Sequence, residues 1–326
     1  MNSSLDSYLS KVKFGRMQQF KNMAVLPVFS PLNECLEFLT LSEALMNQLI
    51  TVTEASELGS VPELKVINKA DIPVFLLDGE ELLGAKQNRI VNTSILLREH
   101  SETIIPVSCT EQGRWQYASR EFHDSDLVLS SMIRGRKSAS VSDSLTKHDR
   151  YESDQHVIWN CISSMSETED VHSQTGAMKD VYEKRKHDLD EFLKTLTHNP
   201  QQQGLLVLIN GKVAGLDIIP NEKAYKVLHP KLVKSYAMDA ILLREKTGNG
   251  KKSDNAASFM DEIRACREEK HKSVGYGWDY RFHGKQVVGS NLEHQLEVIH
   301  ASFFRVDESD QTGCISSYSR RRSYRV

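Results

Sequence analysis

One reversal signal limits the fold of this chain more than any other feature. Asn210-Gly211 lies between two apolar runs, residues 204–209 and 212–219. Both central residues of a type I′ turn need positive φ, which Asn and Gly adopt at little cost, and this turn matches the twist of paired antiparallel strands. We therefore expect a β-hairpin over residues 204–219, and with it an antiparallel sheet.

A second reversal signal stands in the first third of the chain. Asp78-Gly79 separates the continuous apolar run 72–77 from residues 80–83, and a further strand is expected over 89–97. Asp-Gly between apolar runs is also typical of a two-residue hairpin. The unbroken apolar character of 72–77 predicts a strand that is covered on both faces. Residues 104–109 predict another strand.

Three segments have apolar residues at helical spacing. Residues 157–165, 189–196 and 223–244 each place apolar side chains three or four positions apart, which predicts helices with one buried face. Residues 134–153 are instead rich in Ser, Lys, Arg and Asp, which predicts a mobile insertion or a frayed helix. Hairpins with helices between them indicate an α+β fold, with a largely antiparallel sheet and helices packed on it.

Composition limits the size of the core and the kind of partner. The chain has 326 residues, of which 39% are hydrophobic and 26% charged, and its formal net charge is −3. This content supports a sizeable core, and a near-neutral chain without a basic half argues against nucleic acid as a partner. We expect one α+β domain over 25–306, an N-terminal extension over 1–24 and a disordered Ser/Arg-rich tail over 307–326.

Cysteine usage and the apolar pattern indicate where the protein resides. The five cysteines are scattered, without a Cys-x-x-Cys pair or a Cys/His cluster at zinc spacing, so we expect reduced thiols and no metal site. Residues 1–21 lack the apolar segment of a secretory signal, and no apolar stretch reaches membrane-spanning length. We therefore expect a cytoplasmic protein with no membrane partner.

Two polar stretches, residues 76–89 and 106–115, contain the densest set of side chains that could bind a ligand or act in catalysis. Arg binds phosphate or carboxylate through two parallel hydrogen bonds, Trp stacks on flat rings, and Gln and Asn amides read hydroxyls or base edges. Carboxylates serve as general acids and bases. We expect the stretches to meet around a shared space, with Glu80 and Glu111 as catalytic candidates and with these ligand-binding candidates: Lys86, Gln87, Asn88, Arg89, Asn92, Arg114 and Trp115.

Other interpretations of the same residues stay open at this point. Alternation along a strand sends Glu80 and Glu81 to opposite faces, so these charges could simply be cross-paired on a solvated sheet. Cys109, at the end of an apolar strand, is typical of a packed thiol rather than of a nucleophile. Taken alone, Trp115 fits a core position better than a stacking platform.

Read in order, the residues of these stretches resemble the ARPP-type domain, the ADP-ribosylglycohydrolase and rhodanese-phosphatase associated protein family. The resemblance rests on Leu77-Asp78-Gly79-Glu80-x-Leu82-x-Gly84-x-Lys86-Gln87-Asn88-Arg89 with Asn92, and on Ile105-Pro106-Val107-Ser108-Cys109-x-Glu111-x-Gly113-Arg114-Trp115. Later segments are also similar, namely Trp159, residues 207–211 and Ser235-Tyr236-Ala237-Met238-Asp239-Ala240.

The resemblance spans residues from about Val25 to Val306. It implies that the chain binds or processes ADP-ribose, NAD or a related phosphorylated nucleotide, either as a binding domain or as an enzyme. It also implies a role alongside ADP-ribose-related enzymes. It implies no particular cofactor. The alternative from a different class is a non-catalytic structural or interaction protein that forms a homo-oligomer or scaffolds a partner enzyme.

Overall fold

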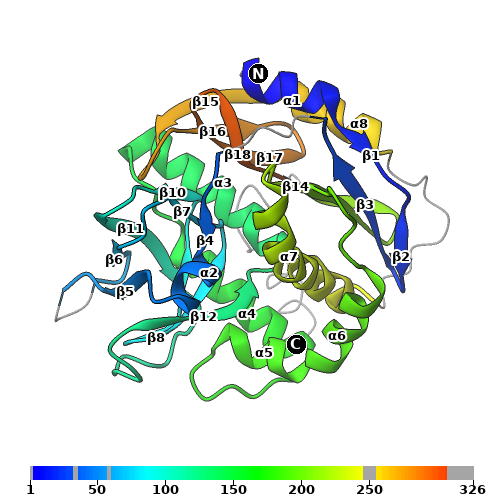
Figure 1. The fold of residues 1–326 in the computed structure, drawn as a ribbon. Coiled ribbons are helices and arrows are strands. Elements are labelled where there is room, and N and C mark those ends of the chain that lie inside the picture. The colour runs from blue at the N-terminus through cyan, green and yellow to red at the C-terminus, as the bar shows by residue number, and fades with distance from the viewer. Residues whose placement is uncertain (1–2, 32–35, 57–59, 245–254, 307–326) are drawn as a thin grey trace.

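The computed structural model describes residues 3–31, 36–56, 60–244 and 255–306. In this part of the chain, nine strands form one antiparallel sheet, which we call the large sheet (Figure 1). Its strand order is β1-β3-β13-β14-β18-β17-β16-β15, and β2 also pairs with β3. The strands are β1 (Lys13–Phe14), β2 (Gln18–Phe20), β3 (Met23–Phe29), β13 (Gly204–Ile209), β14 (Lys212–Ile218), β15 (Arg267–Lys272), β16 (Trp278–His283), β17 (Val287–His294) and β18 (Glu297–Arg305).

The hairpin predicted at Asn210-Gly211 is confirmed. β13 and β14 pair from Gly204↔Ile218 to Ile209↔Lys212. Asn210 and Gly211 have φ values of 51° and 75°, and positive φ at both positions is what a type I′ turn requires. Every residue of β13 is buried, because the hairpin lies in the middle of the large sheet with layers on both faces.

A second sheet has six strands in the order β12-β8-β9-β11-β6-β5, and we call it the curled sheet. Its two edge strands, β5 and β12, come into contact, and an apolar cluster that includes Val52, Leu64 and Leu82 lies against its strands. The small sheet β10-β7-β4 and helix α2 (Leu41–Met46) pack beside it. The strands of these two sheets are β4 (Leu39–Thr40), β5 (Ile50–Glu54), β6 (Glu63–Asn68), β7 (Val74–Leu76), β8 (Glu80–Gly84), β9 (Arg89–Val91), β10 (Ile95–Leu97), β11 (Ser101–Cys109) and β12 (Phe122–Val128).

The hairpin predicted at Asp78-Gly79 is wrong. β7 pairs with β10 and β4, whereas β8 pairs with β12 and β9, so the reversal leads from the small sheet into the curled sheet. Leu77 O accepts from Glu80 N at 3.1 Å, and of the two turn residues only Gly79 has positive φ. This is the pattern of a type II turn, which does not align its flanking strands as a hairpin does. The expectation that β7 is buried on both faces is confirmed.

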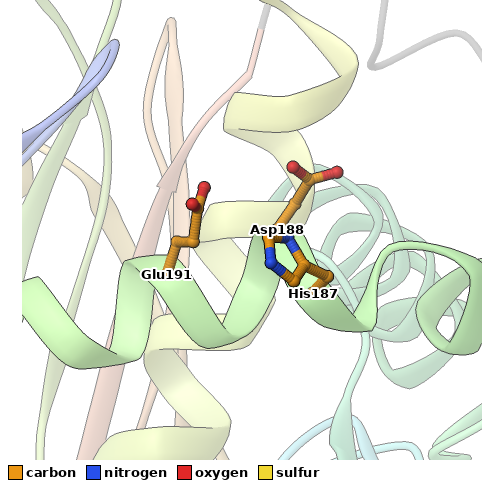
Figure 2. A group of neighbouring side chains, drawn as sticks. All are labelled: His187, Asp188 and Glu191. Carbon is orange, nitrogen blue, oxygen red and sulfur yellow. The ribbon is translucent and has the colours of Figure 1, made fainter.

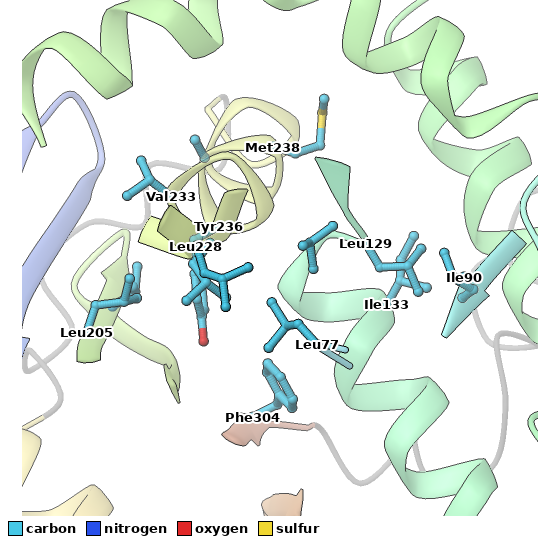
Figure 3. Packing of buried hydrophobic residues seen from close by; sticks show 14 of the residues in the cluster. Leu77, Ile90, Leu129, Ile133, Leu205, Leu228, Val233, Tyr236, Met238 and Phe304 are labelled. Atoms are coloured by element: carbon cyan, nitrogen blue, oxygen red, sulfur yellow. The ribbon is translucent and has the colours of Figure 1, made fainter. Parts of the chain in front are cut away.

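Two long helices lie between the large sheet and the curled sheet. α3 (Ser131–His148) packs on β17 and β18, and α7 (Glu222–Leu242) packs on β13 and β12. Figure 3 shows the core that the sheets and helices share. Leu205 and Phe304 come from the large sheet, Ile90 from β9, and Leu77 from the turn before β8. Ile133 comes from α3, and Leu228 and Tyr236 come from α7. This core joins the two sheets into one packed body.

Five shorter helices complete the layers. α4 (Gln155–Thr168), α5 (Met178–Lys184) and α6 (Lys186–Thr195) extend the helical layer around α3 and α7. α1 (Ser3–Lys11) and α8 (Ala256–Arg264) cover the other face of the large sheet, over a second apolar cluster (Figure 1). The helices predicted over 157–165, 189–196 and 223–244 are thus confirmed as α4, α6 and α7, and so is the α+β class.

The mobile insertion predicted over residues 134–153 is wrong, because α3 runs through most of them and buries Arg134 and Lys137 completely. The polar composition suggested an exposed segment, but these two side chains pair with buried carboxylates that are distant in the sequence. The N-terminal extension expected over 1–24 packs on the large sheet, because Leu5, Tyr8 and Leu9 are buried and β1 pairs with β3.

The tail predicted over 307–326 lies outside the described residues. Among the helices that the structure does describe, none is long and apolar enough to cross a lipid bilayer.

Candidate functional site

The turn that joins β8 to β9 and the loop that follows β11 meet at one end of the curled sheet. Arg114 holds them together: its Nη1 donates to Ala85 O at 2.6 Å, and its Nη2 donates to Asn88 Oδ1 at 3.0 Å and to Glu111 Oε2 at 2.7 Å. Asn88 N donates to Glu111 Oε2 at 3.2 Å. The structure therefore brings together two segments that are separated by more than twenty residues, as the sequence predicted.

We call the contacts of Arg114 with Ala85, Asn88 and Glu111 the clamp. The side chains of Glu111 and Arg114 are both engaged in it. Burial opposes ionisation of Glu111, but hydrogen bonds from Arg114, Thr175 and the backbone of Asn88 outweigh it and lower the pKa of the carboxyl group. Arg114 uses its guanidinium on Glu111 and on backbone carbonyls, including those of Gly84 and Ala85. Both side chains shape the site, and neither has the freedom of a general acid or of a ligand-binding fork.

Arg89 is the residue in this cluster with unused binding capacity. It is 0% exposed, and on the curled sheet it lies opposite Leu82 and Cys109. Its Nη1 donates to Gln87 Oε1 at 3.0 Å, whereas its Nε and Nη2 have no hydrogen-bond partner among the described residues. A buried guanidinium without a carboxylate partner is costly, because it has lost water and gained no opposite charge.

One exposed aromatic ring borders Arg89, and a second lies beside the neighbouring Lys86. The Trp115 ring lies 5.7 Å from the guanidinium carbon of Arg89, and Trp115 is 48% exposed. Lys86 Nζ lies 5.5 Å from the Trp115 ring and 5.1 Å from the ring of Tyr117, which is 52% exposed. Trp115 is therefore not a core residue, and its exposed ring is available for stacking.

Glu54 also belongs to this group, although the sequence interpretation missed it. Its Oε1 accepts from Lys86 N at 3.1 Å, and its buried Oε2 has no partner among the described residues. A signal was present: Ile50, Val52 and Glu54 share the buried face of β5, so a carboxylate occupies an inward position at the strand end. Its proximity to Lys86 could not be predicted, because it arises from the curling of the sheet.

Cys109 has the environment of a packed thiol. It is buried beside Arg89, and burial raises the pKa of its thiol even though the charge of Arg89 acts in the opposite direction. Gln155 bridges its backbone, accepting from Cys109 N at 2.7 Å and donating to Cys109 O at 2.9 Å. A thiol with a raised pKa is a poor nucleophile at neutral pH.

Two predicted site residues lie elsewhere. Glu80 is fully buried and accepts from Lys231 Nζ at 2.7 Å and from Leu77 N at 3.0 Å. Asn92 donates to Tyr151 O at 2.9 Å, and its Oδ1 accepts from Ser108 at 2.7 Å. Each is satisfied by residues outside the clamp, since β8 and β9 carry them away from the turn. The idea of a cross-paired, solvated surface is also wrong, because Gln87, Asn88 and Glu111 are buried.

A deeper polar cluster lies in the core between α3 and the large sheet. Asp217 accepts from Arg134 at 2.7 Å and from Tyr236 at 2.7 Å and lies 3.3 Å from His300 Nε2, and His300 Nδ1 lies 2.8 Å from Ser94 Oγ. Burial opposes ionisation of Asp217, yet the charge of Arg134 and these hydrogen bonds hold its pKa well below the ordinary value. All five side chains are buried, so the cluster stabilises the core.

A group of possible metal ligands appears on α6. His187, Asp188 and Glu191 each place a ligand atom within 4.8 Å of the others, and Figure 2 shows them along one helix. Lys21 already pairs with Glu191 at 2.8 Å and with Asp188 at 3.9 Å. The two carboxylates therefore already have a cationic partner in Lys21.

The comparison with known proteins settles the family. Residues 11–304 match the family described as the ARG and Rhodanese-Phosphatase-superfamily-associated Protein domain, ARPP-1. The chain belongs to this family. The ARPP-1 match takes in the clamp, Arg89 and Trp115, so the candidate site lies within the family domain. No curated protein and no solved structure matches the chain.

Proposed function

We propose that the chain binds a phosphorylated nucleotide, such as ADP-ribose or an NAD derivative, at the end of the curled sheet. The site consists of Glu54, Lys86, Arg89, Trp115 and Tyr117, and we call it the Arg89 site. The observation that carries the proposal is the buried guanidinium of Arg89, which has two N–H positions without an acceptor among the described residues and no ion-pair partner there.

The unused donors of Arg89 fit an anionic oxygen group. Nε and Nη2 form one edge of the guanidinium fork, and two parallel hydrogen bonds from such an edge match the oxygens of phosphate or carboxylate. A bound phosphate would also supply the negative charge that this buried cation lacks. The ammonium of Lys86 adds a second positive charge on the exposed side of the site.

The rings and the carboxylate favour a nucleotide over a simple anion. Trp115 offers a half-exposed face on which a base can stack, and the ring of Tyr117 also lies close to Lys86. The unpartnered Oε2 of Glu54 is an acceptor suited to a sugar hydroxyl. The family description, which names association with other enzymes, agrees with an accessory role in binding.

Binding is better supported than turnover at this site. Glu111 is fixed by Arg114, Glu80 is paired with Lys231, and Cys109 is a packed thiol. We therefore propose a binding domain that works alongside ADP-ribose-related enzymes. An accessory protein of this kind needs affinity for the nucleotide but no group that moves a proton during catalysis.

Isothermal titration with ADP-ribose, NAD and AMP tests the proposal. We expect saturable binding, weakened at least about fivefold in Trp115→Ala, because a stacked base contributes about 1 to 3 kcal/mol. Arg89→Lys should weaken binding as well, since an ammonium cannot form the two parallel bonds. Trp278→Ala is the matched control: Trp278 is 44% exposed and has Lys270 Nζ 4.1 Å from its ring, but it lies on β16.

The result that contradicts the proposal is equally specific. If none of the three nucleotides binds, or if Trp115→Ala binds as well as the parent chain, the Arg89 site is not a nucleotide site. Sedimentation of the same sample would then decide whether the interaction-protein alternative replaces it, because that alternative requires a homo-oligomer or a complex with a partner.

A further inference from the structure

A cavity of about 570 Å³ lies where the turn between β2 and β3, helix α6 and the end of α7 meet. Phe192 of α6 and Ala240 and Ile241 of α7 form the apolar part of its wall. Asn22 of the turn fixes one side of the cavity, because its Nδ2 donates to Ala240 O at 3.0 Å. Pockets of this volume bind small organic molecules.

The charged part of the wall contains more cations than carboxylates. Lys21 comes from the β2–β3 turn, Arg185 lies between α5 and α6, and Arg244 follows α7. Asp188 of α6 is the acidic residue of the wall. Three segments that are distant in the sequence thus bring three positive charges to one cavity, against one negative charge.

The arginines are positioned by a carboxylate that is not part of the wall. Glu169 has a fully buried side chain, and it accepts from Arg185 Nε at 2.5 Å and from Arg244 Nη1 at 2.7 Å. Lys21 Nζ donates to Glu191 Oε2 at 2.8 Å. Glu169 and Glu191 do not line the cavity, so a group inside it meets the cations of the wall first. A concave wall with an excess of one sign of charge attracts the opposite sign.

Lys21 and Arg185 have donors left for a ligand. An ammonium has three N–H donors and a guanidinium has five. Lys21 donates one to Glu191, while Arg185 directs Nε and Nη2 to Glu169 and donates from Nη1 to Asp188 at 3.3 Å. The side chains of Lys21 and Arg185 are 47% and 25% exposed, so they are open to water that a ligand can replace.

We propose that this cavity binds a small organic anion, a carboxylate or a phosphate monoester carried on an apolar body. The anionic oxygens accept from Lys21, Arg185 and Arg244, and the apolar body packs against Phe192 and Ile241. Lys21 Nζ lies 5.8 Å from the Phe192 ring, so the cationic and apolar parts of the wall adjoin. The proposal does not depend on the Arg89 site, which shares no residue with this wall.

The δ1 methyl group of Ile241 provides a local readout. In a sample with ¹³C-labelled isoleucine methyl groups, Ile241→Val assigns its resonance. Phenyl phosphate and benzoate are the anionic probes, and benzylamine is the cationic probe with the same ring. Both anions should shift the Ile241 resonance in a saturable way, and benzylamine should not. The resonance of Ile104, an exposed residue of β11, should stay unmoved.

Two independent variants test the role of the cations. Lys21→Gln and Arg244→Gln should each weaken phenyl phosphate binding about threefold to tenfold, as expected for a partly exposed charged contact. Lys147→Gln is the matched control, because Lys147 is 61% exposed and pairs with Asp143 but lies on α3. It should bind phenyl phosphate as the parent chain does.

Three results would overturn the proposal. The first is that neither anion shifts Ile241, and the second is that benzylamine shifts it as strongly as phenyl phosphate does. The third is that Lys21→Gln and Arg244→Gln both bind phenyl phosphate as well as Lys147→Gln does. The use of two variants keeps the test decisive if one of them fails to fold. ADP-ribose binding to the Trp115→Ala variant reports on the Arg89 site separately.

Discussion

At the scale of single residues, the structure distinguishes buried carboxylates that pair with a cation from buried carboxylates that do not. Glu81 is fully buried on the face of the curled sheet opposite to Arg89, and burial raises the pKa of its carboxyl group to about 7. Its Oε1 accepts from Thr110 at 2.6 Å, whereas its Oε2 has no partner among the described residues. The protonated carboxyl group is thus the form that suits this site.

Glu81 should make the stability of the protein depend on pH. Its folded-state pKa is about 7 against a reference value of 4.5, so the folded state binds the proton more tightly and is stabilised by it at low pH. That contribution is lost as pH rises from the reference value through 7, and amounts to about 3 kcal/mol. Urea denaturation at pH 5 and pH 8 should show Glu81→Gln losing less stability than the parent chain over this interval.

An exposed glutamate provides the control for this measurement. Glu121 is exposed, and Glu121→Gln should retain the full pH dependence of the parent chain, because its carboxyl group remains in water in both states. Equal slopes for Glu81→Gln and Glu121→Gln would show that Glu81 is not the responsible group.

Asp217 illustrates the opposite case, a buried carboxylate that must remain charged. Asp217→Asn removes the nearer counter-charge of the buried Arg134 guanidinium and leaves only Asp78, whose Oδ2 lies 3.5 Å from Arg134 Nε. Removing one partner of a buried pair costs about 3 to 5 kcal/mol. Asp143 is the comparison, since it pairs with Lys147 at 2.8 Å with both side chains about 60% exposed. Asp143→Asn should cost less than about 1 kcal/mol. Comparable losses in urea denaturation would contradict this contrast.

At the scale of elements, the central hairpin depends on two glycines for different reasons. Gly211 has φ of 75°, and an added Cβ would meet no atom within 4 Å, so Gly211→Ala carries only the backbone penalty, about 1 to 2 kcal/mol. A Cβ on Gly204 would lie 2.4 Å from Asp217 O, which is backbone of the paired strand. Thermal denaturation should therefore show a much larger loss for Gly204→Ala. A larger loss for Gly211→Ala would contradict this account.

The same elements show which parts of the fold are readable from sequence. The hairpin at Asn210-Gly211 is local, because the turn residues and the strands they join are adjacent in the chain. The turn at Asp78-Gly79 is not, since the carboxylate of Asp78 pairs with Lys137 of α3 and its flanking strands find partners in two different sheets. α3 was misread for the same reason: its buried Arg134 and Lys137 pair with Asp217 and Asp78, which are distant in the sequence.

In the candidate site, too, some contacts follow from the local sequence and others do not. Lys86, Gln87 and Asn88 lie in one turn, and Arg89 begins β9. Because β9 and β11 are paired neighbours, the proximity of these residues to Glu111 and Arg114 follows from adjacent strands. Glu54 joins them only because β5 meets the opposite edge of the curled sheet. The guanidinium of Arg114 has acceptors for its donors, whereas that of Arg89 has donors without acceptors among the described residues. This difference depends on contacts that no sequence pattern specifies.

At the scale of the whole molecule, the large sheet is covered on both faces, and the N-terminal helix supplies part of one cover. Leu5, Tyr8 and Leu9 of α1 are buried in the cluster that also contains Phe259 of α8 and Phe303 of β18. α1 extends from Ser3 to Lys11, so almost all of it precedes the segment that matches the family, which begins at residue 11. The part of the cover that α1 supplies therefore lies almost entirely outside the family match, whereas α8 lies within it.

Loss of this cover should expose the sheet without disturbing the candidate site. Leu5→Ala with Leu9→Ala removes two buried side chains, and each truncation costs about 2 to 3 kcal/mol. We expect a lower urea midpoint and increased binding of a hydrophobic dye, while Lys11→Ala, at an exposed position of the same helix, changes neither. ADP-ribose affinity should be unaffected wherever the double variant is folded, because the Arg89 site belongs to the curled sheet and α1 packs on the large sheet. A double variant as stable as Lys11→Ala would mean that α1 adds nothing to the core it touches.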